Sequence, residues 1–579
     1  MDPRQLRFVL PVGLCAMSFI AFSPVLQADF LAWDDTLNII EVPQIRGLGW
    51  DNLRWMFFDF GPDIRYKPIT YLAWAIIHAI GGLKPFLFHL ANLAMHSING
   101  CLLIFVLNRL GNLAIGEPQQ KSVETWRWQA AAVVALIWTV HPLRVETSAW
   151  VSVLSYSLAV FFLLLAIMTF LGCDQEKLLF RQGRYWSALG LFQLGMMSFP
   201  TAIGFSFAFL AVSIFPLRRR QVWLPILPFF ALTAIMVVVG LYGQHVKQGI
   251  WGNPISLDEI PLSSRVLGSI YFLAYYGWRP LYPFKMFTLN EDLVGMTASD
   301  PRLIAAIVLV LGVTAWVCIK RKSSPALLAT FVAFVGITFP VLKLTGGTPF
   351  PGPGDRYSLI PGLAWIAGVY GLVMLLRDHR HRNRLLAGLT MIAVIFTVQS
   401  RGRSEVWEND LTFFTDQVHT LNGNVYRGQA YARLAKAMLA AEEYDGGFAA
   451  CELSWQLAPP VAASQVGSIQ GQILFQLGRA EEAVIVLERT RQFLPTDGAV
   501  LQWLAATHFA LGDPTKGMLV FNELIASHPA DPTSYFVTAN TLASFGNFDA
   551  AIDVVEQGLQ RIPDSEHLQQ LRQQLQQAR

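Results

Sequence analysis

Long apolar runs occupy most of the first 400 of the 579 residues. A helix needs about 20 residues to cross the hydrocarbon core of a bilayer. Eight runs meet or approach that length, and three shorter or proline-broken runs are interpreted as further crossings. The eight runs are 8–28, 87–108, 149–172, 222–242, 301–319, 325–344, 358–376 and 385–400, and the three are 129–140, 185–198 and 199–217. The sequence therefore predicts an α-helical integral membrane domain over residues 1–400, with about 11 transmembrane helices.

The composition argues against a purely soluble enzyme. Charged residues make up 14% of the chain, whereas soluble domains average about 25%. Residues 401–579 carry 12 Lys and Arg against 20 Asp and Glu, while residues 1–400 carry 31 against 20. The two parts therefore have opposite net charges and are expected to be different kinds of domain. No basic tract is interleaved with aromatic residues, so nucleic acid is not predicted as a partner.

Clusters of Lys and Arg predict the orientation in the membrane. If they all face the cytoplasm, the N-terminus is inside, and the loops 29–86, 141–148, 243–300 and 345–357 lie on the opposite face. Counting the apolar stretch 263–282 as a crossing would put Lys320, Arg321 and Lys322 on the wrong side, so we interpret it as interfacial or re-entrant. The clusters are Arg4 and Arg7; Lys121 and Arg127; Lys177, Arg181 and Arg184; Arg218, Arg219 and Arg220; Lys320, Arg321 and Lys322; and Arg377, Arg380, Arg382 and Arg384.

The first run also has the positive flank of a signal peptide. It lacks a small-residue cleavage pattern and many spans follow it, so we interpret it as an uncleaved anchor. An odd number of crossings then leaves residues 401–579 outside the cytoplasm. The expected location is the inner (plasma) membrane, with the C-terminal part on the periplasmic side.

Residues 425–563 form a repeat array with a period of 34 residues. Leu477-Gly478, Leu511-Gly512 and Phe545-Gly546 recur at this spacing, as do Pro495, Pro529 and Pro563. Together with an earlier, looser copy at about 425–460, they resemble four tetratricopeptide repeats. Residues 401–424 are expected to be a linker or helix, and the Gln-rich residues 564–579 a capping helix. Such an array typically binds a partner protein and performs no chemistry.

Acidic residues are frequent in the predicted external loops. Asp34 and Asp35 follow the first span almost at once, and paired carboxylates at a membrane surface can act as a general base or hold a divalent cation. A solvated loop start or a helix cap is the alternative. The acidic residues of these loops are Asp34, Asp35, Glu41, Asp51, Asp59, Asp63, Glu146, Asp258, Glu259, Glu291, Asp292 and Asp355.

Three further clusters are predicted on the same face. Tyr66-Lys67-Pro68 leads to His89 and Asn92, residues 141–146 contain His141, Arg144 and Glu146, and Asp355-Arg356-Tyr357 follows the Gly/Pro-rich loop 346–354. Ionisable groups at membrane depth are costly and tend to be functional. Each cluster alone could be a structural ion pair or a snorkelling side chain, and Arg356 could simply pair with Asp355 or Glu146. Their convergence on one face favours a functional site.

These motifs resemble a known family of membrane enzymes. In order and spacing they are similar to the GT-C superfamily of multi-spanning glycosyltransferases that end in tetratricopeptide repeats. Within that group, the chain looks most like bacterial relatives of the transmembrane O-mannosyltransferases targeting cadherins. The resemblance covers nearly the whole chain. It rests on Trp33-Asp34-Asp35 with Asn38; Tyr66-Lys67-Pro68; His89-Leu90-Ala91-Asn92 with His96; His141 to Glu146 with Ala149-Trp150; Asp355-Arg356-Tyr357; and Trp407 with Leu411.

The resemblance implies an inverting transfer on the non-cytoplasmic face. The donor would be a polyprenyl-phosphate-linked sugar, and the acceptor a protein hydroxyl or an envelope glycan. Asp34 or Asp35 would be the base, and Arg356 the main phosphate partner, because its planar fork binds phosphate bidentately. Lys67 and Arg144 are weaker phosphate candidates, which His141 and Glu146 could orient. His89, Asn92, Asp355 and Tyr357 are expected to support them. No cofactor is certain, and a divalent cation is left open.

Three sets of charges that the related proteins usually carry are absent. Leu154, Ser155 and Tyr156 stand where an Arg-Lys-Asp triplet is usual, Phe199 stands for a Lys, and Ser213 stands for an Asp. One alternative is therefore a non-catalytic membrane scaffold that uses the repeats to assemble envelope proteins. A transporter or flippase of lipid-linked sugars is another alternative, although the spans show no internal duplication of the kind many transporters have.

Overall fold

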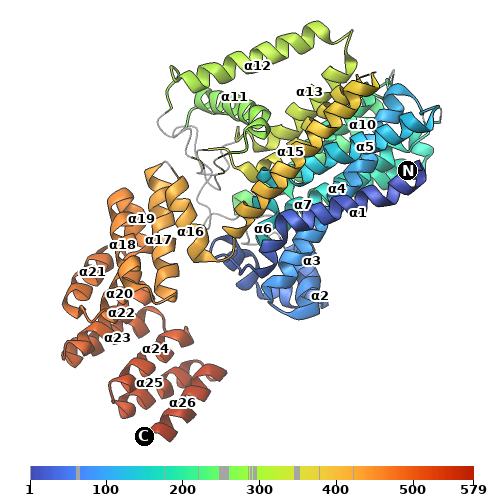
Figure 1. The fold of residues 1–579 in the computed structure, drawn as a ribbon. Coiled ribbons are helices and arrows are strands. Elements are labelled where there is room, and N and C mark those ends of the chain that lie inside the picture. Colours follow the sequence, from blue (N-terminus) through green and yellow to red (C-terminus); the bar gives the residue numbers. More distant parts are fainter. Residues whose placement is uncertain are drawn as a thin grey trace. The chain divides into compact units, whose positions relative to one another are not determined.

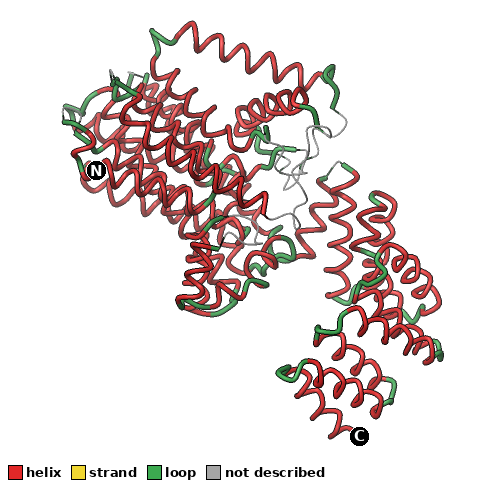
Figure 2. Tube along the Cα trace, turned by 180° about the vertical axis from the view of Figure 1, so that it is seen from behind, coloured by secondary structure: helices red, strands yellow, loops and turns green. Residues whose placement is uncertain are grey.

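The structure is a computed structural model, and it describes residues 2–59, 66–174, 177–219, 221–246, 260–284, 286, 290, 296–344, 352–376, 378–421 and 423–579. The regular structure in these ranges is helical, with no strand (Figure 2). The chain divides into two units, Met1–Thr412 and Phe413–Arg579. The predicted all-helical fold class is confirmed at this level. Five acidic residues of the predicted loops, two arginines and most of the Gly/Pro loop lie outside the described residues: Asp63, Asp258, Glu259, Glu291, Asp292, Arg220, Arg377 and residues 346–351.

The first unit is a helical bundle (Figure 1). In it, α4 packs against α1, α5 and α7, and α13 packs against α9 and α14. Its helices are α1 Pro3–Phe22, α2 Trp50–Phe58, α3 Pro68–Gly81, α4 Pro85–Ile115, α5 Lys121–Thr139, α6 Val145–Ala149, α7 Leu154–Leu171, α8 Gly183–Ser198, α9 Ser206–Ile214, α10 Trp223–Val246, α11 Leu262–Trp278, α12 Pro301–Lys320, α13 Pro325–Thr338, α14 Pro361–Met374 and α15 His379–Glu405, and α16 Asp410–Thr420 crosses into the second unit.

Every predicted span coincides with a helix, but only six helical segments in the described ranges are long and apolar enough to cross a membrane. The six are Pro3–Gln27, Pro85–Ile115, Val151–Leu171, Trp223–Tyr242, Pro301–Lys320 and Arg380–Glu405. The count of 11 is therefore not reached. Pro200, Pro325 and Pro361 each open a helical segment, because proline fits the first turn and not the interior. The helical segments that begin at these prolines, Pro200–Ile214, Pro325–Val341 and Pro361–Met374, are shorter than the apolar runs in which they lie.

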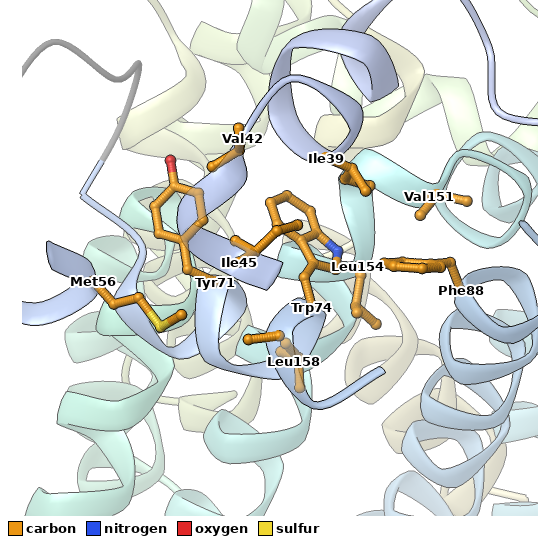
Figure 3. Packing of buried hydrophobic residues seen from close by; sticks show 11 residues of the cluster. Ile39, Val42, Ile45, Met56, Tyr71, Trp74, Phe88, Val151, Leu154 and Leu158 are labelled. Atoms are coloured by element: carbon orange, nitrogen blue, oxygen red, sulfur yellow. The ribbon is translucent and has the colours of Figure 1, made fainter. Parts of the chain in front are cut away.

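Buried apolar side chains under the first loop hold that loop on the bundle. Trp74 of α3 is fully buried in a cluster with Ile39 and Ile45 from the loop and Leu154 and Leu158 from α7 (Figure 3). Burying one large apolar side chain contributes about 1.5–3 kcal/mol. The loop that carries Asp34 and Asp35 is therefore packed against α3 and α7.

The second unit consists of helix pairs that repeat every 34 residues, a tetratricopeptide-like helical repeat fold. Gly478, Gly512 and Gly546 end the first helices of three pairs with φ of 72°, 76° and 80°, the left-handed conformation that glycine adopts most easily. The pairs are α17 Asn424–Ala440 with α18 Tyr444–Leu457, α20 Gly467–Gln476 with α21 Ala480–Phe493, α22 Gly498–Ala510 with α23 Pro514–Ser527, and α24 Pro532–Ser544 with α25 Phe548–Arg561; α19 Pro459–Gln465 precedes the second pair, and α26 Glu566–Ala578 packs on the last.

Candidate functional site

The two carboxylates after α1 differ in their surroundings. Asp35 is 1% exposed. Its Oδ1 accepts hydrogen bonds from the backbone N and the hydroxyl of Ser152, and its Oδ2 accepts one from the backbone N of Leu31 at 3.1 Å. Burial raises the pKa of Asp35 to about 7, although these hydrogen bonds oppose the shift. Asp35 therefore ties the first loop to the start of the α7 region.

Asp34 is only half-buried and is the more accessible carboxylate. Its backbone oxygen accepts a hydrogen bond from Asn38 Nδ2 at 2.9 Å, and Asn38 Oδ1 accepts one from Lys67 Nζ at 2.9 Å. The Lys67 ammonium also lies over the ring of Trp74, 4.4 Å from its centroid. Lys67 is thus buried against the first loop, and its charge contacts aromatic faces and an amide oxygen.

Arg356 forms a buried ion pair with Glu146. Its Nη1 donates to Glu146 Oε1 at 2.7 Å, and its backbone N donates to Glu146 Oε2 at 2.9 Å. The two side chains are 14% and 7% exposed. Burial raises the pKa of Glu146 to about 7, and the charge of Arg356 opposes this shift. The guanidinium carbon lies 5.4 Å from the ring centroid of Trp150 and 4.8 Å from that of Tyr357.

Asp355 contacts a different arginine. Arg279 donates to both carboxylate oxygens, at 2.9 and 2.8 Å, and the Tyr275 hydroxyl donates to Oδ1 at 2.6 Å. The sequence prediction missed Arg279 and Tyr275. The sequence feature that could have predicted them is the spacing of the two residues: Arg279 ends an apolar stretch and follows Tyr275 by four residues, so both lie on the same helix face. Lys343, which was also missed, donates to the backbone oxygen of Gly352 at 2.8 Å.

His141 and Arg144 lie in the short turn between α5 and α6. His141 Nε2 donates to the backbone oxygen of Pro280 at 2.9 Å, and its Nδ1 accepts from the backbone N of Leu143. Burial and the nearby Arg144 lower the pKa of His141 to about 3, so its ring is neutral at physiological pH. Arg144 Nη2 donates to the Ser358 hydroxyl at 3.0 Å, while its buried Nε and Nη1 have no partner among the described residues. Burial lowers the pKa of Arg144 to about 9.

His89 and Asn92 of α4 hold backbone groups. Asn92 Nδ2 lies 3.1 Å from each of the backbone oxygens of Thr147, Ser148 and Trp150. His89 Nε2 lies 3.3 Å from the backbone oxygen of Asp29. An unpaired backbone carbonyl is costly at membrane depth, so Asn92 stabilises the irregular backbone that follows Glu146.

Trp150 lies between the first loop and the Glu146–Arg356 pair. Its ring contacts Trp33 and Trp407, each at a centroid distance of 6.1 Å, as well as Arg356. The acidic first loop and the Glu146–Arg356 pair therefore meet around one indole. A cavity of about 20 Å³ adjoins this region, and a cavity of that size has room for a water molecule. It is lined by Pro142, Leu143, Val145, Glu146, Met286, Asp355, Arg403 and Trp407.

Aromatic side chains fill the place of two of the missing charges. Tyr156 and Phe199 stack at a centroid distance of 3.9 Å, and Tyr156 lies 6.1 Å from Tyr357. Both are buried, and the hydroxyl of buried Ser213 has no partner among the described residues. In the described part of the chain, no group of three or more His, Cys, Asp or Glu side chains could hold a metal ion.

No known protein-family model matches the chain, and no curated protein matches it. Among solved structures, a chain from the one titled "Crystal structure of APC/C hetero-tetramer Cut9-Hcn1" aligns with 84% of this chain and 90% of its own length. The identity is 9% and the TM-score 0.24. A likeness at that score carries no weight for the fold or the function of this chain.

Proposed function

We propose that the first unit transfers a sugar from a polyprenyl-phosphate donor to a hydroxyl acceptor. The observation that carries the proposal is the contact of Trp150 with both Trp33, which directly precedes the first-loop acids, and Arg356, which pairs with Glu146. A displacement at an anomeric carbon needs a base on one side and cationic groups near the leaving phosphate on the other. Both kinds of group are buried or half-buried there, where electrostatic interactions are stronger than in water.

Asp34 is the proposed base, because it is the more accessible carboxylate and Asp35 is occupied with Ser152 and Leu31. The acceptor oxygen attacks the anomeric carbon, its proton passes to Asp34, and the bond to the phosphate oxygen breaks. The configuration of the sugar inverts, and polyprenyl phosphate leaves.

Arg144 is the cation with donors to spare for the leaving phosphate, since its Nε and Nη1 have no partner among the described residues. Arg356 can contribute only if it leaves Glu146. A divalent cation stays open in this mechanism, and His141 orients the turn that carries Arg144.

The topology belongs to the same proposal. We infer 11 crossings, with the shorter helices embedded among the longer ones, and an uncleaved N-terminal anchor. The Lys and Arg clusters then face the cytoplasm, and the repeats lie on the periplasmic side of the inner membrane. There the repeats would bind the acceptor or a partner protein.

A second candidate is a non-catalytic scaffold. The observation that favours it is the packing of Tyr156 against Phe199 and Tyr357, beside an Arg356 already paired with Glu146. A cavity of about 20 Å³ is also too small for a sugar, so transfer requires these groups to move apart.

The deciding experiment compares the glycans of envelope proteins and polysaccharides in cells with the gene, without it, and with an Asp34→Asn variant. The enzyme predicts that one glycan disappears in both the deletion and the variant. The scaffold predicts unchanged glycans in the variant, with altered envelope assembly only in the deletion.

A further inference from the structure

The N-terminal ends of α1, α5 and α15 come together in the first unit. These three helices pack against one another (Figure 1). Arg7 of α1 lies 3.5 Å from Glu124 in the first turn of α5, and Arg382 of α15 lies over Trp126 of α5. The three helices therefore begin at the same end of the bundle.

Cationic residues lie in the first two turns of these three helices. They are exposed or half-buried, and we call them the basic patch: Arg4, Arg7, Lys121, Arg380, Arg382 and Arg384. Helix N-termini also carry partial positive charge, equivalent to about half an elementary charge each. Cations at helix N-termini are therefore unfavourable unless an anion is present.

The carboxylates near the basic patch do not balance it. Asp2 and Asp378 cap α1 and α15 by accepting hydrogen bonds from backbone N–H groups, and Asp378 also contacts His381 at 2.7 Å. Glu124 pairs with Arg7, as described above. At the caps and first turns of these three helices, three carboxylates thus stand against six cations, and two of the three are engaged with helix backbone.

Two tryptophans hold part of the basic patch in position. The Arg382 guanidinium lies 4.3 Å from the ring centroid of Trp126, and that of Arg7 lies 5.5 Å from the ring of Trp128. Both indoles are 7% exposed, and the buried Nε1 of Trp126 has no partner among the described residues. Cation–π contacts restrict the arginine side chains, so less ordering is needed when an anion binds.

Apolar side chains continue from the basic patch along α1. Phe8 is 77% exposed and Val12 is 69% exposed. They are one and two turns beyond Arg4, on a helix that is apolar enough to cross a membrane. Fixed cations beside an apolar helix surface fit a molecule that has both a phosphate and acyl chains.

We propose that the basic patch binds the phosphate headgroup of an anionic phospholipid, whose acyl chains lie along α1. Arg7 and Arg382 contact the phosphate, and Phe8 and Val12 contact the chains. The other Lys and Arg clusters give matched controls. Lys320 and Arg321, at the end of α12, are equally cationic and exposed, and no aromatic ring is described over either of them.

The test measures thermal unfolding of the full-length protein in an uncharged detergent, with added phosphatidylglycerol, phosphatidylcholine or inorganic phosphate. Phosphatidylglycerol should raise the midpoint of the wild type, and the other two additives should not. In R7Q/R382Q the lipid should bind about 30-fold more weakly, because each of the two lost cations contributes about 1 kcal/mol at an anionic surface. The control K320Q/R321Q should bind like the wild type.

An undiminished lipid effect in R7Q/R382Q overturns the proposal, and so does an equal loss in both variants, which would mean general charge attraction. A similar shift with inorganic phosphate would show a free-anion site and overturns the lipid assignment. If R7Q/R382Q does not fold, R7Q alone is the substitute, because the Arg7 side chain is 53% exposed. In that variant, about 5-fold weaker binding of phosphatidylglycerol supports the proposal and unchanged binding overturns it.

Discussion

Removing Arg356 should destabilise the protein in a pH-dependent way. Arg356→Ala leaves Glu146 buried, with the backbone N–H of residue 356 as its only remaining donor from that turn. Breaking a buried pair by deleting one partner typically costs about 3–5 kcal/mol. The carboxyl can avoid much of this cost by taking up a proton, since burial already raises the pKa of Glu146 to about 7 in the intact pair.

The direction in which folding stability changes with pH follows from proton binding. A carboxyl with a raised pKa in the folded state binds more protons there than in the unfolded chain, where its pKa is about 4.3. Folding stability therefore falls as pH rises from about 4.3 through the folded-state pKa. Without the opposing charge of Arg356, the pKa of Glu146 rises further. We expect Arg356→Ala to cost little at pH 5 beyond its lost packing on Trp150 and Tyr357, and about 3–5 kcal/mol at pH 8.

The assay is thermal unfolding of the purified full chain at pH 5 and pH 8, with scan rates compared because membrane proteins often unfold irreversibly. Arg302→Ala is the matched control, since Arg302 is 54% exposed in its pair with Asp300 and its loss should not move the midpoint measurably. The variant R356A/E146Q should recover most of the loss at pH 8. Equal destabilisation at both pH values, or none at pH 8, would refute the reasoning.

Three further predictions concern the first loop, the topology and the repeats. Asp34→Asn should lower transfer by about 10²–10⁴-fold with unchanged stability, whereas Asp35→Asn should lower the unfolding midpoint by disturbing the hydrogen bonds with Ser152 and Leu31; full transfer in both variants would exclude a carboxylate base. A periplasm-active reporter should work after Arg403 and fail after Arg382, and the reverse pattern would contradict the proposed orientation. Gly478→Ala should destabilise the second unit by about 1 kcal/mol, because φ is 72° there, and calorimetry should show no loss in the first unit.

Local signals in the sequence predicted the helices and the repeats well. Leu477-Gly478 and its copies predict a helix end because glycine readily adopts the left-handed backbone conformation found there. That preference does not depend on distant residues. Apolar length located the helices, because a long apolar run needs no partner to be recognised. It overestimated the number of long helices, since the helical segments Pro200–Ile214 and Pro361–Met374 are shorter than the apolar runs 199–217 and 358–376 in which they lie.

Tertiary contacts decided what the sequence left open. Asp34 and Asp35 are adjacent, and only the contact with Ser152, 117 residues away, distinguishes them. The choice between Asp355 and Glu146 as the partner of Arg356 likewise depended on Arg279, which occupies both oxygens of Asp355. Pairings across such sequence distances have no period or spacing from which they could be predicted.

The same contacts reduce the choice between enzyme and scaffold to whether a donor phosphate can reach an arginine in this site. Transfer needs phosphate to compete with Glu146 for Arg356, or to bind Arg144, whose Nε and Nη1 have no partner among the described residues. The phosphodiester of the donor carries one negative charge, as a carboxylate does, and the leaving polyprenyl phosphate carries more. Both accept bidentate hydrogen bonds from arginine, so the exchange at Arg356 is feasible wherever a donor can reach it. Tyr156 and Phe199 are packed beside that arginine through Tyr357. An enzyme that binds the donor through Arg356 therefore requires these aromatic side chains to move apart, and a scaffold requires them to stay packed.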